Sequence, residues 1–222
     1  MRTGTGAATA MGGRTIDPPV IHGGGVPRIG PNAIVQTLRA LAESHGDEAA
    51  ATLSRRADLP HDSWTALVPE SWFIRVIREL RVILPPSEAE AVLRRAGALT
   101  GDYVRENRIP APFRLALALL PPRVALPLLI RAFRRHAWTF AGSGRFQVEG
   151  PFPGTLVLDG APTCRHARGP ERSGSYYEAA FETLLSLACP GIRVREAACR
   201  AVGDPACRFR LELPSHSSPG GL

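Results

Sequence analysis

The residues best suited to chemistry lie near the end of the chain, where two of its four cysteines flank a turn. Cys199 and Cys207 stand on either side of Gly203-Asp204-Pro205, and Glu196 precedes the first cysteine by three residues. Apolar residues alternate on both sides of the turn, which predicts a hairpin that brings the two thiols together. Two thiolates and a carboxylate are plausible zinc ligands. Buried apolar thiols and a redox pair are the alternative interpretations.

The start of the chain bears on these alternatives. The first thirty residues contain no apolar core, so no secretory signal is predicted and we expect a cytoplasmic protein. Disulfides are rare in that reducing compartment. A zinc site would need a fourth ligand from outside the hairpin. The candidates are Cys164 and Cys189, with His166 behind them. Any one of these would complete a structural zinc site with Glu196, Cys199 and Cys207.

Four separated segments resemble a known family. The segment from Glu196 to Phe209 resembles the closing motif of the four-vinyl-reductase domain, which also occurs in sensor modules of aromatic-responsive bacterial regulators. Three others resemble motifs of the bacteriochlorophyll 4-vinyl reductase (BchJ) family: RIGPNAI at 28–34, HAWTFAGSGRF at 136–146 and YYEAAFE at 176–182. The resemblance covers about residues 26–213 in order.

The resemblance implies a fold and a metal site. The fold is an α+β domain with N-terminal helices packed on an antiparallel sheet, similar to vesicle-tethering and ligand-sensing modules with an apolar pocket. Zinc-binding relatives carry a cysteine just ahead of the aromatic pair, where this chain has Ser173-Gly174-Ser175. Either Cys164 substitutes for that cysteine from the preceding loop, or no metal is held.

The family name implies reduction of a vinyl group, which requires a source of hydride or electrons. The nearest approach to a dinucleotide motif, Gly142-Ser143-Gly144, lacks the third glycine and follows a predicted helix. Four scattered cysteines also make a poor iron–sulfur site. We therefore expect a protein that binds a magnesium tetrapyrrole, such as a chlorophyllide or magnesium-protoporphyrin-type pigment, and assists its reduction or delivery beside other bacteriochlorophyll biosynthesis enzymes. The alternatives are a divinyl (proto)chlorophyllide vinyl reductase and a small-molecule sensor.

The central motif supplies candidate pigment contacts. A neutral His136 imidazole can ligate magnesium, Trp138 and Phe140 can pack on the macrocycle, and Arg135 or Arg145 can pair with a propionate. The alternative interpretation of His136 is a cap on the carbonyls at a helix end. The glycines of the motif are expected to permit a tight turn.

Composition limits the remaining function classes. The chain has 222 residues, is 44% hydrophobic and carries a net charge of +7, with every basic residue an arginine. Without lysine there is neither a Schiff-base residue nor a Walker A loop. No nucleic-acid-binding motif accompanies the basic charge, so no nucleic acid partner is expected. A basic surface can simply be exposed to solvent, or it can bind a carboxylate-bearing ligand, an acidic partner or anionic lipid. Peripheral contact with the photosynthetic membrane and a homodimer are both compatible with it.

The pattern along the chain predicts one α+β domain. We expect a flexible arm at 1–26, a domain at 27–213 that is mainly helical to residue 140 and α+β from 141, and a flexible tail at 214–222. Helices are predicted from residues 31, 47, 69 and 87, and again at 175–187. The proline-broken apolar stretch 115–130 is predicted to form two short buried helices. Two pairs of strands complete the domain.

Overall fold

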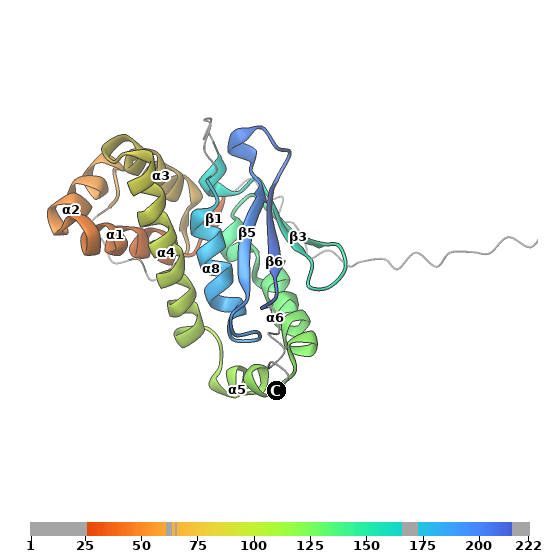
Figure 1. Cartoon of the computed structure of the whole chain (residues 1–222). Helices are drawn as coiled ribbons and strands as arrows, with labels where there is room; N and C mark the ends of the chain where they lie inside the picture. The colour runs from red at the N-terminus through yellow and green to blue at the C-terminus, as the bar shows by residue number, and fades with distance from the viewer. Residues whose placement is uncertain (1–25, 61–63, 65, 166–172, 215–222) are drawn as a thin grey trace, which may run out of the picture.

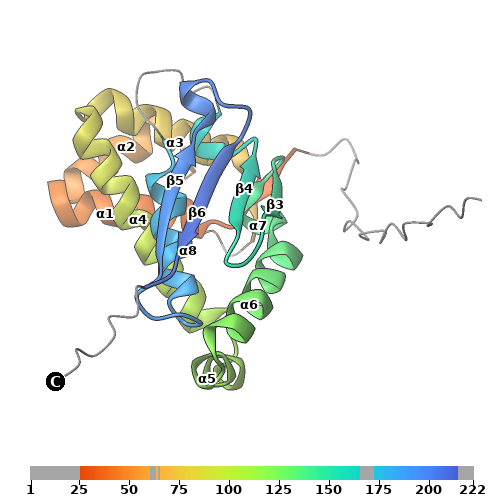
Figure 2. The same ribbon diagram turned by 45° about the vertical axis from the view of Figure 1, so that its right-hand side comes forward.

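The structure is a computed structural model that describes residues 26–60, 64, 66–165 and 173–214. The expected arm and tail lie almost entirely outside these ranges. Helices α1 to α4 form one side of the molecule and a four-stranded sheet the other, with α8 between them (Figures 1 and 2). Helices α5 and α6 extend below both parts. This arrangement confirms the predicted class, an α+β domain with helices packed on an antiparallel sheet.

The helices follow the predicted order. They are α1 (Asn32–His45), α2 (Asp47–Arg56), α3 (Glu70–Ile83), α4 (Pro86–Asn107), α5 (Ala111–Leu119), α6 (Pro122–His136), the short α7 (Trp138–Ala141) and α8 (Ser175–Leu185). Prolines stand in the first turn of α4, α5 and α6, where the missing N–H costs no hydrogen bond and the fixed φ favours helix. Two 3₁₀ turns, Pro162–Cys164 and Arg200–Val202, lie in loops of the sheet.

The main sheet has the strand order β3-β4-β6-β5 and is antiparallel throughout. Its strands are β3 (Arg145–Glu149), β4 (Thr155–Asp159), β5 (Arg193–Ala198) and β6 (Cys207–Glu212). The predicted hairpin around Gly203 is present as β5 and β6, with a bulge between Glu196 and Ala198. A separate two-stranded ribbon joins β1 (Arg28–Ile29) to β2 (Val68–Pro69) and ties the start of the domain to α3.

Helix α8 is the centre of the core because it packs on α4 on one side and on the sheet on the other. Its contact with α4 depends on two glycines. A Cβ on Gly97 would stand 2.0 Å from the carbonyl oxygen of Tyr176, and one on Gly101 would stand 2.7 Å from Cβ of Thr183. Distances this short are forbidden sterically, so the two helix backbones approach as closely as they do only because α4 has no side chains there.

Aromatic rings fill the space between α8, α6, α7 and the sheet. Phe181 of α8 is their common neighbour, because its ring centroid lies 5.6–5.9 Å from those of five other rings. These are Phe133, Phe140, Phe146, Tyr177 and Phe209. Tyr177 is fully buried and its hydroxyl donates a 3.0 Å hydrogen bond to the carbonyl of Phe140. The interior between helices and sheet is therefore packed with side chains from both.

One expectation about burial is wrong. The stretch 115–130 does form two short helices, but only Leu117 of α5 is buried, while Leu115 and Leu119 are 61% and 76% exposed. The physical reason is position: α5 lies at the foot of the molecule, between the end of α4 and the start of α6 (Figure 1). Apolar periodicity indicated burial, yet no second layer covers this helix.

Replacing Gly97 with alanine tests the close contact of α4 and α8. In an ordinary helix interior, Gly→Ala stabilises by up to about 1 kcal/mol. Here we expect the substitution to lower the free energy of unfolding by about 1–3 kcal/mol, because the new methyl group would clash with the backbone of Tyr176. Urea unfolding measures the difference. Ala91→Gly, at an exposed position of the same helix, is the control that measures helix propensity alone. A raised melting temperature in Gly97→Ala would contradict the packing argument.

Candidate functional site

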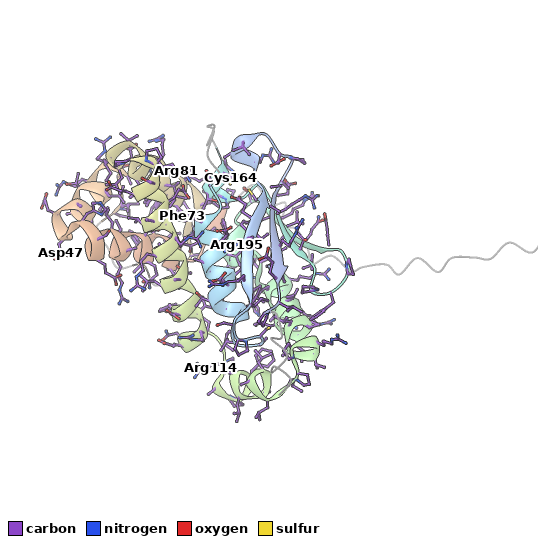
Figure 3. All side chains as sticks on the ribbon, in the orientation of Figure 1. Asp47, Phe73, Arg81, Arg114, Cys164 and Arg195 are labelled. Carbon is purple, nitrogen blue, oxygen red and sulfur yellow. The ribbon has the colours of Figure 1, made fainter. Side chains whose placement is uncertain are left out.

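The four predicted metal ligands come together at one end of the sheet. Cys164 ends the 3₁₀ turn after β4, Glu196 lies on β5, Cys199 follows that strand, and Cys207 begins β6. One ligand atom from each lies within 4.8 Å of those of the other three, and all four residues are buried. Figure 3 shows Cys164 at this end of the sheet, opposite the end where α5 lies. The described residues thus contain a compact three-sulfur, one-carboxylate donor set.

The thiols contact one another directly and are free, not disulfide-bonded. Sγ of Cys207 donates to Sγ of Cys164 at 3.0 Å, and Sγ of Cys164 lies 3.6 Å from Sγ of Cys199. The loop between β5 and β6 is fixed by Asp204, whose carboxylate accepts the N–H of Cys199 at 2.7 Å. The Gly-Asp-Pro turn of the sequence therefore positions a cysteine as well as reversing the chain.

Burial and proximity shift the pKa values within this cluster. The pKa of Cys199 is lowered, chiefly by hydrogen bonds from Cys164 and Cys207, so this sulfur is the favoured thiolate. Interaction with Cys199 raises the pKa of Cys164 to about 12, and the pKa of Cys207 is raised, chiefly by its hydrogen bond with Cys164. Burial, followed by the charge on Cys199, raises the pKa of Glu196 to about 9. Without a cation, the cluster therefore holds protons on three of its four groups.

The segment that precedes α8 approaches the cluster through its backbone. The N–H of Ser173 donates to Sγ of Cys199 at 3.3 Å, and the N–H of Gly174 donates to Oε2 of Glu196 at 3.0 Å. A Cβ on Gly174 would lie 2.4 Å from the Glu196 carboxyl carbon, so a side chain there would displace this carboxylate. Where zinc-binding relatives have a cysteine, this chain therefore supplies backbone N–H donors. Cys164 provides the third sulfur of the cluster.

The remaining candidates for a fourth ligand lie elsewhere. Cys189 is buried in the turn after α8 and belongs to the apolar core instead of the cluster. Its pKa is raised by burial, as expected of an unreactive thiol. His166 lies outside the described residues.

The central motif at 136–146 joins three parts of the fold. The carbonyl of Thr139 accepts the N–H of Gly30 at 2.8 Å, which connects α7 to the first strand. Gly142 has a φ of +60° and faces the carboxylate of Glu70, to which Ser143 donates through both its N–H and its hydroxyl, at 3.0 and 2.9 Å. The glycine of this motif thus serves a tight turn around a buried carboxylate, as the sequence suggested.

The five predicted pigment contacts do not share one buried cavity. Phe140 packs in the aromatic core, whereas Arg135, His136 and Arg145 are exposed and Trp138 is 55% exposed. Arg135 and His136 end α6 and Trp138 begins α7, so these three lie close together along the surface. Among the described residues, His136 makes no side-chain hydrogen bond, so its ring is not observed to cap its helix. Their contact with a pigment stays a prediction.

A surface depression of about 370 Å³ lies between the end of α8 and the start of β5. It is lined by Glu182, Thr183, Ser186, Gly191, Ile192 and Arg193. None of the predicted pigment residues borders it. It therefore does not correspond to the apolar pocket that the resemblance implies.

Sequence reasoning missed two buried carboxylates that organise the site. Glu70 is 2% exposed and receives Ser143 and Arg165. Glu178 is 8% exposed, pairs with Arg94 and accepts the N–H of Glu196. Glu70 is the first residue of α3, and Glu178 lies in the first turn of α8. In the sequence, both resemble the acidic residues that commonly occur at the start of a helix. No local pattern distinguishes a buried acid from an exposed one.

Comparison with known proteins gives the family. No family model matches the chain. The bacteriochlorophyll synthase 23 kDa chain of Cereibacter sphaeroides is 38% identical over 186 residues, which cover 83% of this chain and 90% of that protein. That of Rhodobacter capsulatus is 39% identical over 190 residues, covering 83% and 87%. The chain belongs to the family of the bacteriochlorophyll synthase 23 kDa chain.

Solved structures resemble this bacteriochlorophyll synthase 23 kDa family member in fold. An Fe(II) unliganded H-NOX protein mutant from K. algicida superimposes with a TM-score of 0.56 at 11% identity, covering 85% of this chain and 98% of that one. An H-NOX protein from S. oneidensis gives a TM-score of 0.47 at 14% identity, covering 82% and 98%. The superposition on the K. algicida protein shows that the two chains share a fold.

The protonation of the cluster predicts how any metal bound there responds to pH. Glu196, protonated up to about pH 9, Cys164, protonated up to about pH 12, and Cys207, whose pKa is also raised, must each release a proton, whereas Cys199 need not. Metal affinity should therefore rise with pH, by up to about tenfold per unit for each proton displaced. Competition titrations with a chromogenic chelator measure this slope. Glu196→Gln should bind more weakly with a shallower slope, and pH-independent binding would contradict the assignment.

Proposed function

We propose that this protein takes part in bacteriochlorophyll synthesis by binding a magnesium tetrapyrrole intermediate and assisting its reduction or delivery. The observation that carries the proposal is the family: relatives named as a chain of bacteriochlorophyll synthase share 38–39% identity along almost their whole length. By the same argument its protein partners are other enzymes of that synthesis. The vinyl-bearing precursor is the finer choice of ligand, and it rests on the resemblance of four segments to the four-vinyl-reductase (BchJ) family.

An assisting role fits the fold better than a self-sufficient nicotinamide reductase. Dinucleotides are held at the carboxyl ends of parallel strands joined by helices. In the described residues every strand pair is antiparallel. The Gly142-Ser143-Gly144 turn, the nearest sequence match to a phosphate-binding loop, is instead occupied by the Glu70 carboxylate. A carboxylate in that position repels a phosphate.

The surface at the junction of α6 and α7 is the proposed pigment contact. The exposed imidazole of His136 would ligate the magnesium, and the exposed indole of Trp138 would lie against the macrocycle. Arg135, one residue away, offers a guanidinium to a propionate, and Arg145 offers another from the start of β3. Phe140 lies behind this surface in the aromatic core and would support it.

We also propose that Cys164, Glu196, Cys199 and Cys207 hold one structural zinc ion. The donor set suits zinc, because three thiolates and a carboxylate complete a tetrahedral site. Zn–S bonds of about 2.3 Å at tetrahedral angles place sulfurs about 3.8 Å apart, near the 3.6 Å between Cys164 and Cys199. The shorter Cys164–Cys207 separation of 3.0 Å would lengthen when zinc replaces the hydrogen bond between these thiols. Zinc would neutralise the thiolates and join the turn after β4 to β5 and β6.

A pigment titration tests the main proposal. Purified protein mixed with a magnesium porphyrin or chlorophyllide at micromolar concentration should show a shifted Soret band and quenched fluorescence. His136→Ala should weaken binding about tenfold or more, equivalent to about 1.4 kcal/mol, and change the spectrum of what remains bound. The absence of any spectral change with the native protein would exclude pigment binding.

The matched control is His45→Ala, since His45 also lies in the last turn of a helix but belongs to α1. That variant should leave the pigment spectrum and affinity unchanged, although it loses a hydrogen bond with Glu88. If both histidine variants lower only the melting temperature, His136 is a structural residue and does not ligate the pigment.

Metal analysis tests the zinc proposal. The native protein should contain about one zinc per chain, lost in Cys199→Ser and in Cys207→Ser, with several kcal/mol of stability lost in parallel. Cys189→Ser is the matched control, because Cys189 is equally buried but lies outside the cluster and should keep the metal. A metal-free native protein that gains no thermal stability from added zinc would show that these are only buried thiols.

A further inference from the structure

We propose that α5 and α6 form a docking surface for a bilayer that contains anionic lipids. We call residues 111–135 the α5–α6 hairpin. The inference goes beyond the proposed function, since pigment binding requires no membrane contact. It depends on three features of this hairpin: exposed aliphatic side chains, unpaired arginines and a fixed, projecting position.

Several exposed side chains of the hairpin are aliphatic. Leu115 and Leu119 of α5 are 61% and 76% exposed, and Val124 and Leu128 of α6 are 47% and 42% exposed. The other exposed residues of α5 are proline and alanine. Side chains of this kind gain free energy when they leave water, at about 25 cal/mol per Å² of buried apolar surface. Clustered exposure on neighbouring helices therefore indicates a surface that is covered in use.

The charge of the hairpin has one sign only. No Asp or Glu occurs from Asn107 to Val148, while arginines recur throughout that stretch. Elsewhere many arginines have carboxylate partners, such as Arg200 with Asp159 and Arg208 with Glu149. In the described part of the chain, four exposed arginines of α6 form no ion pair. They are Arg123, Arg131, Arg134 and Arg135. Unpaired cations beside exposed aliphatic residues favour an anionic, apolar partner.

Aliphatic and basic side chains lie along one face of α6. Val124, Leu128, Arg131 and Arg135 recur at spacings of four, three and four, so they lie on one side of the helix. Within this set the aliphatic pair is nearest the turn to α5, and Arg131 and Arg135 are further along. A bilayer interface has the same order, with acyl chains below and phosphates above.

The hairpin is held rigidly at the foot of the molecule. Arg114 donates to the carbonyls of Arg105, Glu106 and Ile109, at 2.7, 3.1 and 3.3 Å, and so fixes α5 to the end of α4. Figure 3 labels Arg114 at this junction. Both ribbon views place α5 at the end of the molecule furthest from the 3₁₀ turn between β5 and β6. The hairpin therefore presents its exposed side chains at one end of the domain.

A lipid surface fits better than a second copy or another protein. A symmetric dimer through this face would place unpaired arginines of two copies together with no acidic residue between 107 and 148 to offset them. A protein interface commonly includes about one hydrogen bond per 100–200 Å². The exposed side chains of α5 offer no hydrogen-bonding groups, and acyl chains require none. No helix in the described ranges is long and apolar enough to cross a bilayer, so the hairpin would lie on the surface.

Vesicle flotation of the full chain tests the proposal. The native protein should float with vesicles of phosphatidylcholine and phosphatidylglycerol, and much less with phosphatidylcholine alone. Leu115→Asn/Leu119→Asn should weaken binding to the anionic vesicles at least tenfold. Arg123→Gln/Arg131→Gln should weaken it about thirtyfold, from about 1 kcal/mol for each arginine near the surface. All four residues are exposed, so the variants should fold normally.

The matched control is Arg195→Gln/Arg210→Gln, which removes the same charge from the sheet and should keep vesicle binding and pigment binding alike. Equal losses in this control and in Arg123→Gln/Arg131→Gln would overturn the assignment to the hairpin. Native protein that binds neither vesicle would also overturn it. So would a larger complex in cell extract that Leu115→Asn/Leu119→Asn dissociates, because the partner would then be a protein. Unchanged pigment titration in the leucine variant separates this result from the proposed function.

Discussion

The fold depends on how two carboxylates of α8 hold the edge of the sheet. Glu178 and Glu182, one helical turn apart, accept the backbone N–H groups of Glu196 and Val194 on β5. Because β5 is an edge strand, these donors have no neighbouring strand to bond. The carboxylates satisfy them and set the height and register of the strand relative to the helix. The close contact at Gly97 then fixes α8, and with it the strand, relative to α4 and the helices packed on α4.

This constraint also builds the cysteine cluster. The N-terminal end of α8 lies where Ser173 and Gly174 donate their N–H groups to Cys199 and Glu196. Fixing β5 against α8 therefore places the carboxylate and one thiol, and the pairing of β5 with β6 adds Cys207. The cluster is a consequence of how helix, strand and turn meet, and a metal there would strengthen contacts that already exist.

The two ends of the molecule differ in chemistry. One end holds a buried sulfur and carboxylate cluster, and the other presents the aliphatic and basic α5–α6 hairpin. The proposed pigment surface at His136 and Trp138 lies between them, at the far end of α6 from the turn to α5. An arrangement of this kind would let one rigid domain rest on a membrane while it presents a pigment to a partner enzyme. Each part is separately testable because the residues involved do not overlap, apart from Arg135.

The sequence by itself determined the α+β class, the order of most helices and strands, the starts of five helices, and the hairpin that joins Cys199 to Cys207. These features depend on local patterns: apolar periodicity, prolines at helix starts and a Gly-Asp-Pro turn. Tertiary structure decided that Cys164, not Cys189, completes the cluster, that Glu70 and Glu178 are buried and that α5 is exposed. Those outcomes depend on which distant segments pack together, and a residue's type and immediate neighbours do not record what the rest of the chain places over it.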